Sequence, residues 1–270
     1  MTARRLLARV GALSDTGLQR EHNEDRYLVQ ELGGAPADGP LPDAIDLSLS
    51  TLLLAVCDGM GGAVAGEVAS GLAVGALAER ARDGAALGRG HHLDPGAMED
   101  WLLGGVREAN LRTLRRGQEE EELEGMGSTL TCVLLGGETL LLAHVGDSRA
   151  YHLRGERLRR ISLDHSFVGR LVAMGRISEA EARRHEQRNL LLEAVGGAPE
   201  LEIDRLRVTV REGDRLLLCS DGLSNLVGEE EIREILGGAR QTAEQCAVLV
   251  EMANARGGDD NITVVVAHLS

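Results

Sequence analysis

Aromatic residues are scarce in this chain, which has one Trp, two Tyr and one Phe among 270 residues. The hydrophobic fraction is nevertheless 43%, so a substantial core must be built from Leu, Val, Ala and Ile. Basic residues are also few, 29 against 43 acidic ones, and the formal net charge is -14. A nucleic-acid-binding protein needs a basic face, so this balance argues against one. No apolar run approaches the roughly 20 residues of a membrane-spanning helix, so we expect no membrane segment.

Cysteine is nearly absent too, and its spacing is uninformative. None of the four cysteines stands in a CxxC pair, and three lie inside apolar runs: Cys57, Cys132 and Cys219, with Cys246 elsewhere. We therefore expect the cysteines to be small buried hydrophobic residues in a reducing compartment, and not to form disulfides. The first 15 residues lack the apolar segment of a signal peptide, so the sequence predicts a cytoplasmic protein.

Apolar patterning predicts paired strands and two groups of helices. Strands are expected at residues 6–13, 26–32, 52–57, 128–135, 139–145, 149–154, 157–163, 200–219 and 262–270. Helices are expected at 63–82, 97–116, 164–195, 229–236 and 241–254, and loops at 33–50 and 83–96. Glycines at 136–137 and 155 predict two hairpins. Hairpin-linked strands with grouped helices favour an α+β domain on antiparallel sheets. No linker or repeat interrupts the chain, so we expect a single domain over residues 1–270.

Acidic residues stand where the apolar strands end. Asp58, Asp147 and Asp221 follow the runs LLLAVC, LLLAHV and RLLLCS, and Asp260 precedes ITVVVA. A single Asp-Gly pair is an ordinary turn. Four carboxylates at the ends of buried strands instead favour a site for several hard cations, since Mg²⁺ and Mn²⁺ prefer oxygen ligands. This pattern predicts hydrolysis by a metal-bound hydroxide.

Two further features fit such a site. A backbone carbonyl can ligate a cation where no side chain blocks its approach, as at Gly59. Arg20 offers a planar fork of donors that matches two phosphate oxygens. It precedes Glu24 and Asp25 by four and five residues, so the three side chains could face one pocket. The alternative for Arg20 is an ordinary surface position.

Other hydrolytic schemes lack their motifs. A cysteine phosphatase needs Cys-x5-Arg, and no arginine stands six residues after any cysteine. The motifs DxDxT, GDxHG, GxSxG, HExxH and GxxxxGK[ST] are also absent. His165 is expected to be a loop residue near the site rather than a metal ligand.

Six motifs in order carry a resemblance to a known family. They are REHNED, CDGMGGAVAGE, GMGSTLT, HVGDSRAY, CSDGLSN and GGDDNITVVVA. The set resembles the PP2C (PPM) family of metal-dependent protein serine/threonine phosphatases, with the bacterial stand-alone members most similar, from about Val10 to Leu269. Residues 164–196 look like the family's mobile flap segment. The resemblance implies an α+β fold of two packed antiparallel β-sheets, flanked by helices on both outer faces.

It also implies a binuclear Mn²⁺ or Mg²⁺ centre between the sheets. Asp58 would bridge the two ions, and the Gly59 carbonyl would bind the second. Asp221 and Asp260 would complete the first ion's ligands. Asp147 and Asp221 together would bind a third ion, which is held more weakly.

The remaining implied roles concern water and substrate. Asp25, with Glu24, would hold waters on the second ion, and Arg20 would bind the phosphate. The expected catalytic residues are therefore Arg20, Asp58 and Asp221. A metal-bridging hydroxide would attack phosphoserine or phosphothreonine directly, without a covalent enzyme intermediate. Partners would be phosphorylated proteins, among them Ser/Thr kinases and their substrates, and the protein would act as a monomer.

The sequence departs from the family pattern at three positions. Ser128 stands where Thr is usual, and Ala63 where bacterial relatives often have histidine. Met60 stands where animal members carry a proposed general-acid histidine, so the general acid is open and a metal-bound water is the alternative. Two other functions stay open: a non-enzymatic phosphopeptide-binding pseudophosphatase, and a phosphatase for small-molecule esters or for regulatory proteins that resemble anti-sigma-factor antagonists.

Overall fold

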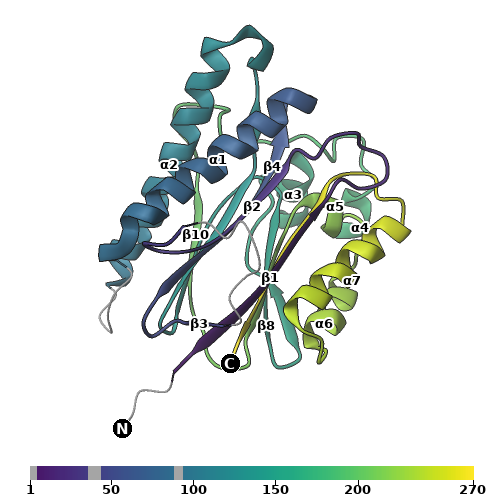
Figure 1. Ribbon diagram of the computed structural model, residues 1–270. Coiled ribbons are helices and arrows are strands. Elements are labelled where there is room, and N and C mark those ends of the chain that lie inside the picture. Colours follow the sequence, from purple (N-terminus) through teal and green to yellow (C-terminus); the bar gives the residue numbers. More distant parts are fainter. Residues whose placement is uncertain (1–4, 36–43, 88–93) are drawn as a thin grey trace.

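Two antiparallel sheets pack against each other in this computed structural model, which describes residues 5–35, 44–87 and 94–270 (Figure 1). The first sheet has the strand order β3-β1-β12-β11-β8-β9. Its strands are β1 (Leu7–Asp15), β3 (Ile45–Asp46), β8 (Arg149–Arg154), β9 (Arg157–Arg160), β11 (Arg215–Cys219) and β12 (Ile262–Leu269). The second sheet has the order β10-β7-β6-β4-β2, and β5 also pairs with β4. Its strands are β2 (Asp25–Glu31), β4 (Thr51–Met60), β5 (Gly127–Ser128), β6 (Leu130–Gly136), β7 (Thr139–Val145) and β10 (Asp204–Thr209).

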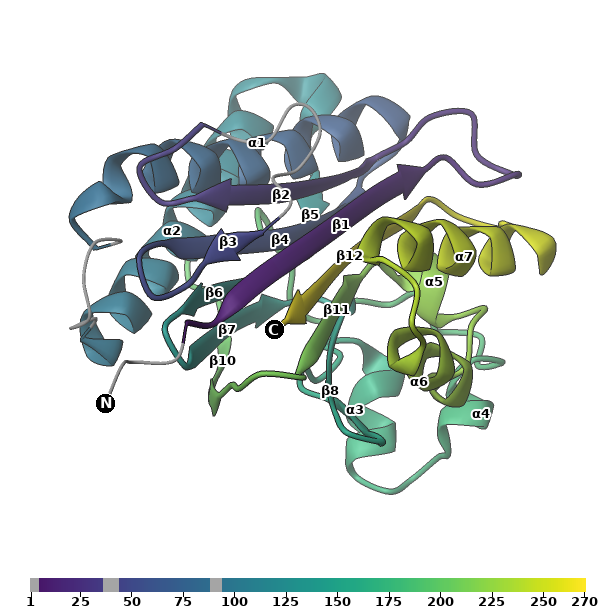
Figure 2. The same ribbon diagram turned by 60° about the horizontal axis from the view of Figure 1, so that its bottom comes forward.

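Helices cover the outer face of each sheet (Figure 2). The second sheet is covered by α1 (Ala63–Asp83) and α2 (Pro95–Glu119), and the first by α5 (Asp221–Ser224), α6 (Glu229–Gly237) and α7 (Thr242–Ala255). Short 3₁₀ turns follow α1 and α2, at Gly84–Ala86 and Glu121–Leu123. Between β9 and β10 lie α3 (Phe167–Ala173) and α4 (Glu179–Ala182). In the described part of the chain, no helix is long and apolar enough to cross a membrane.

Strand β4 shows why the sheets form this way. Leu52, Leu54 and Val56 face the other sheet, whereas Leu53 and Cys57 face α1 and α2. Both faces are therefore buried, which is why the apolar run is continuous instead of alternating. Full burial of one such leucine contributes about 2 kcal/mol. This packing fixes the end of β4, and with it the position of the acidic residue that follows.

The predicted fold class is confirmed, with three corrections to its elements. Residues 200–219 are not one strand. They form β10 and β11, which lie in different sheets, because the chain turns at Gly213 with φ of +87°. Residues 164–195 are helical only in α3 and α4. The rest of that segment is held by backbone hydrogen bonds to Gly146 and Ser128. The loop expected at 33–50 contains a short strand, β3 (Ile45–Asp46), which pairs with β1. Other parts of the loops expected at 33–50 and 83–96 lie outside the described residues.

Candidate metal centre

The strand directions bring the acidic residues to one edge of both sheets. Strands β4 and β7 run the same way because β6 lies antiparallel between them, so Asp58 and Asp147 share an edge. Strands β11 and β12 are antiparallel neighbours, so Asp221 after β11 meets Asp260 before β12. Residues 16–24 cross from β1 to β2 at this same edge, where β1 ends opposite the start of β12 and β2 begins opposite the end of β4.

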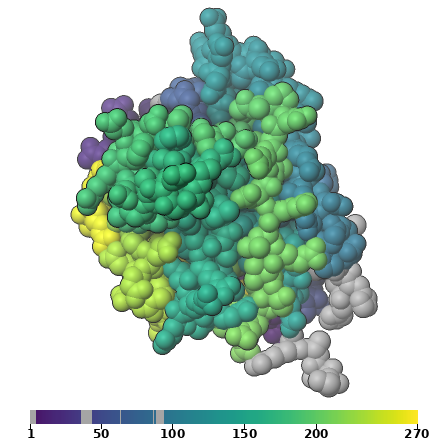
Figure 3. All heavy atoms as spheres, turned by 180° about the vertical axis from the view of Figure 1, so that it is seen from behind, coloured from purple at the N-terminus to yellow at the C-terminus, as the bar shows by residue number. Residues whose placement is uncertain are grey.

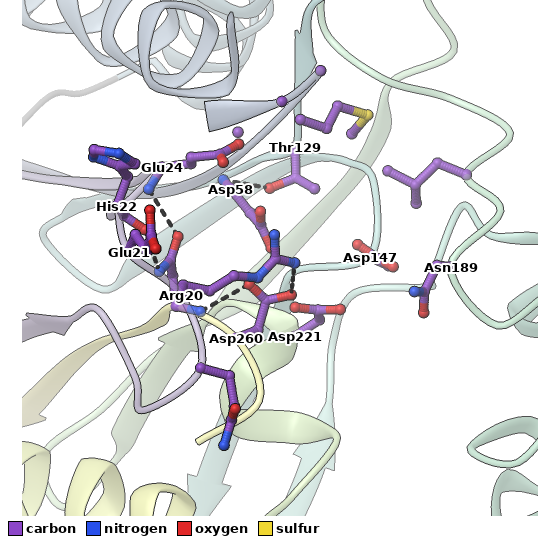
Figure 4. A pocket seen from close by; sticks show the side chains of 17 residues that line it. Arg20, Glu21, His22, Glu24, Asp58, Thr129, Asp147, Asn189, Asp221 and Asp260 are labelled. Carbon is purple, nitrogen blue, oxygen red and sulfur yellow. Dashed lines mark hydrogen bonds and ion pairs between the residues drawn. The ribbon is translucent and has the colours of Figure 1, made fainter. Parts of the chain in front are cut away.

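A cavity of about 470 Å³ opens at this edge (Figure 4). Seven of the eight predicted site residues line it: Arg20, Glu24, Asp58, Gly59, Asp147, Asp221 and Asp260. Figure 4 shows the carboxylates of Asp58, Asp221 and Asp260 directed toward one another, with Asp147 beside them. The eighth residue, Asp25, is only 2% exposed and lies behind this wall.

Asp58 is held by a hydroxyl network on the neighbouring strand. Its backbone N–H donates to Oγ1 of Thr129 at 2.9 Å, and that oxygen lies 2.7 Å from Oγ of Ser148. The network links the end of β4 to the turn that carries Asp147. Burial raises the pKa of Asp58 well above its usual value, and the nearby carboxylates of Asp25 and Asp221 raise it further.

Asp25 stands directly opposite Asp58 in the β2–β4 ladder. Oγ of Ser220 donates to its Oδ2 at 2.7 Å, while Oδ1 is buried without a hydrogen-bond partner among the described residues. Burial is the main cause that raises the pKa of Asp25 to about 8. The expectation that Glu24 and Asp25 face the pocket together is therefore corrected, because only Glu24 lines the cavity. Asp25, the first residue of β2, is instead buried and accepts a hydrogen bond from Ser220.

Gly59 has a packing role in addition to the predicted role of its carbonyl as a metal ligand, which stays a prediction. A Cβ at this position would lie 2.0 Å from the carbonyl oxygen of Gly66 in α1, so glycine allows β4 to approach the helix. Gly146 has φ of +104°, a conformation that favours glycine, and a Cβ there would lie 2.6 Å from Cγ2 of Thr129. It forms the turn that brings Asp147 to the cavity.

Arg20 lies across the cavity from β4. Its Nη2 is 2.7 Å from Oδ2 of Asp260, and this hydrogen bond is the main cause of its raised pKa. The side chains are 49% and 37% exposed, so solvent screens much of the attraction. The prediction that Arg20 and Glu24 face one pocket is confirmed, because both residues line the cavity.

Asn261 fastens the crossing segment, a role that we did not predict from the sequence. Its Oδ1 accepts from the Glu24 N–H at 2.8 Å, and its Nδ2 donates to the carbonyls of Thr16 and His22. Thr129 and Ser220 are similarly unpredicted. All three stand inside the motifs GMGSTLT, CSDGLSN and GGDDN. For Ser220 and Asn261 the available signal was a hydroxyl or amide next to a candidate ligand, whereas Thr129 has no such neighbour.

These residues fit hard divalent cations. Among the described residues, no three His, Cys, Asp or Glu side chains lie close enough to hold an ion by themselves. Mg²⁺ keeps several waters, however, and needs few protein ligands. The donors around the cavity are carboxylate oxygens, Oδ1 of Asp25 lacks a partner, and burial and mutual repulsion disfavour the charged forms. Positive charge in the cavity would favour the charged forms of these carboxylates.

Comparison with known proteins identifies the family. Residues 38–256 match the family model described as protein phosphatase 2C. The chain is 37% identical over 255 residues to the serine/threonine phosphatase stp of Listeria monocytogenes, with 94% of this chain and 93% of that protein covered. The chain belongs to the protein phosphatase 2C family. It is also 41% identical over 268 residues to PstP of Mycobacterium tuberculosis, covering 98% of this chain and 45% of that protein.

Solved structures of protein phosphatase 2C enzymes agree. Stp1 of Staphylococcus aureus superposes with a TM-score of 0.84 at 31% identity, covering 97% of this chain and 94% of that one. The catalytic domain of PstP, solved in complex with two manganese ions, has a TM-score of 0.79 at 40% identity, covering 98% and 99%. The predicted family, fold and assignment as a protein serine/threonine phosphatase are thus confirmed. The roles of the individual site residues remain predictions.

We expect the metal-free protein to lose stability between pH 6.5 and pH 8.5. Folding raises the pKa of Asp25 to about 8, and that of Asp58 well above 3.8. As pH rises, the carboxyl groups therefore lose their protons in the unfolded chain at a lower pH than in the folded chain. Stability then falls as pH rises. Burial lowers the pKa of His144 and His268 to about 4, so these two histidines make stability rise with pH. Their effect ends at about pH 6.5, the pKa of an unfolded histidine, and so lies below this pH range.

The measurement is the melting temperature in chelator at both pH values. We expect it to be at least about 5 °C lower at pH 8.5. Added Mn²⁺ should remove most of the difference, because a bound cation favours the charged carboxylates. Equal melting temperatures at the two pH values would contradict the raised pKa values.

Proposed function

We propose that this chain hydrolyses phosphoserine and phosphothreonine in proteins at the cavity described above. The observation that carries the proposal is the convergence of Asp58, Asp147, Asp221 and Asp260, from strand ends in both sheets, opposite Arg20. The family membership supports the same reaction. We also keep the predictions that Ser/Thr kinases and their substrates are its targets, and that it acts as a cytoplasmic monomer.

In this proposal, Asp58, Asp221, Asp260 and the Gly59 carbonyl would hold two Mn²⁺ or Mg²⁺ ions. Glu24 and Asp25 would order the surrounding waters. Such ions, when bound, lower the pKa of water toward neutrality and neutralise phosphoryl charge. A third, weaker ion would involve Asp147 together with Asp221.

The chain's own residues position the substrate, and the cavity offers no free thiol or hydroxyl nucleophile. Among the described residues that line the cavity, none is Cys or Ser, and the Thr129 hydroxyl is already bonded to Asp58 and Ser148. Cys57 is fully buried, and burial raises the pKa of its thiol. This supports direct attack by water rather than a covalent intermediate. Arg20 is free to exchange Asp260 for phosphoryl oxygens, where its fork would stabilise charge in the transition state.

The test is phosphate release from a phosphothreonine peptide by the purified protein. We expect release with Mn²⁺ or Mg²⁺ and none with chelator. Binding of the peptide without release, at any ion concentration, would instead support the pseudophosphatase. Comparable rates on small phosphate esters and no preference for peptides would favour the small-molecule alternative.

We expect Arg20→Ala to raise KM for a phosphopeptide about tenfold, with a smaller fall in kcat. Loss of one charge-assisted hydrogen bond to phosphate is worth about 1.5–3 kcal/mol, and solvent exposure favours the lower end. Steady-state kinetics with saturating Mn²⁺ gives both constants. The matched control is Arg233→Ala, because Arg233 pairs with Glu230 on the surface of α6. Unchanged constants for Arg20→Ala would assign that residue to the surface.

A further inference from the structure

A second, smaller hollow adjoins the metal centre. Its volume is about 40 Å³, and Asp147, Asn189 and Asp221 line both hollows. Its other wall is formed by the segment of residues 164–196, which is the green mass on the surface in Figure 3. In Figure 4, Asn189 lies beside Asp147. A group bound in the small hollow would therefore lie next to a phosphate bound in the large one.

Two ion pairs neutralise the acidic residues that the segment itself contributes to this hollow. Nη2 of Arg149 lies 2.6 Å from Oδ2 of Asp164, and both side chains are about one-tenth exposed. Nη2 of Arg160 lies 2.7 Å from Oε1 of Glu179. These pairs fasten the segment to the first sheet. Asp147 and Asp221 are the remaining acidic residues of the hollow, and the proposed function assigns them to cations.

Two arginines of the hollow have almost no partners. Arg188 makes no side-chain hydrogen bond or ion pair with any described residue. Arg183 makes a single long hydrogen bond, 3.5 Å, to the Ser224 carbonyl. Both side chains are exposed. Other exposed arginines, such as Arg176, also lack a side-chain partner among the described residues, so the distinguishing feature of Arg183 and Arg188 is their place in the wall of this hollow. Each offers a planar fork that matches a carboxylate or a phosphate.

We propose that this hollow is a subsite for a second anionic group of the substrate, on a residue close to the phosphorylated one. The inference rests on the proposed function, since it takes the first phosphate to lie at the metal centre. Alternate side chains of an extended peptide emerge on the same side about 6.6 Å apart, which suits two adjoining hollows. Arg183 and Arg188 would bind either a carboxylate or a second phosphate.

The experiment compares three phosphothreonine peptides that differ only at the positions two residues before and after the phosphothreonine. These positions carry Ala, Glu or phosphoserine, so that the last two separate a carboxylate from a phosphate. The proteins are the unmodified chain, the double variant Arg183→Ala/Arg188→Ala, and Arg176→Ala. Arg176 is an exposed arginine of the same segment that does not line the hollow. The readouts are kcat/KM at saturating Mn²⁺ and, separately, hydrolysis of p-nitrophenyl phosphate.

We expect the unmodified chain and Arg176→Ala to prefer the Glu peptide or the phosphoserine peptide about tenfold over the Ala peptide. The double variant should lose this preference and keep its rate on the Ala peptide and on p-nitrophenyl phosphate. Equal rates on all three peptides, or a preference that survives in the double variant, would overturn the subsite. If no substrate is hydrolysed, the proposed function fails separately, and tighter binding of the anionic peptides to the unmodified chain than to the double variant still decides the subsite.

Discussion

Asp58→Asn is expected to lower kcat/KM for a phosphopeptide by about a thousandfold or more, while raising the melting temperature of the metal-free protein. Asp58 lies where β4 ends, and it is the only predicted ligand of both ions. Loss of a cation from a hydrolytic site removes several kcal/mol of transition-state stabilisation, and each 1.36 kcal/mol is a factor of ten in rate.

The opposite effect on stability follows from the same charges. Burial and the carboxylates of Asp25 and Asp221 raise the pKa of Asp58, so at pH 8 its charged form is costly without a cation. Asparagine keeps the shape and removes that cost. Activity and the melting temperature in chelator should therefore move in opposite directions, which misfolding cannot produce.

A suitable control is Asp259→Asn. Asp259 precedes Asp260 in the same motif, but it is exposed and does not line the cavity. This variant should keep its activity and its melting temperature. Turnover by Asp58→Asn at the rate of the unmodified chain would refute the metal assignment.

Local sequence information was sufficient for the acidic residues at strand ends. Each of Asp58, Asp147 and Asp221 follows a run that is apolar because both faces of its strand are buried. Such runs can be recognised without knowing the partners of the strand. Their meeting at one edge required strand order and direction, which the family resemblance supplied and the composition could not.

The details that could not be predicted depend on contacts between distant segments. Asp25 is buried because it stands opposite Asp58, and its hydrogen bond to Ser220 joins residues 195 positions apart. Asn261 ties down the segment before β2 from 237 positions away, through Glu24. The division of residues 200–219 into β10 and β11 likewise depends on which sheet each half joins. Propensity and periodicity describe neighbours in the chain, so they do not carry this information.

Asp147→Ala is expected to lower activity at least about tenfold at low Mn²⁺, with partial recovery at high Mn²⁺. The third ion is proposed to be held weakly, so a weakened site can still be filled by mass action. The first two ions should stay bound, because Asp58, Asp221 and Asp260 are unchanged. The measurement is a Mn²⁺ titration of phosphopeptide hydrolysis, with Asp259→Ala as the matched control.

The alternative role of Asp147 is to anchor its turn. Its conformation is already set by Gly146 and by the hydrogen bond between the Thr129 and Ser148 hydroxyls. Burial is the main cause that raises the pKa of the Asp147 carboxylate well above its usual value, and Asp221 and Asp164 add to the effect. Removing the carboxylate should therefore leave the melting temperature in chelator unchanged or higher. A lower melting temperature combined with an unchanged Mn²⁺ activation curve would show that Asp147 supports the turn and binds no third ion.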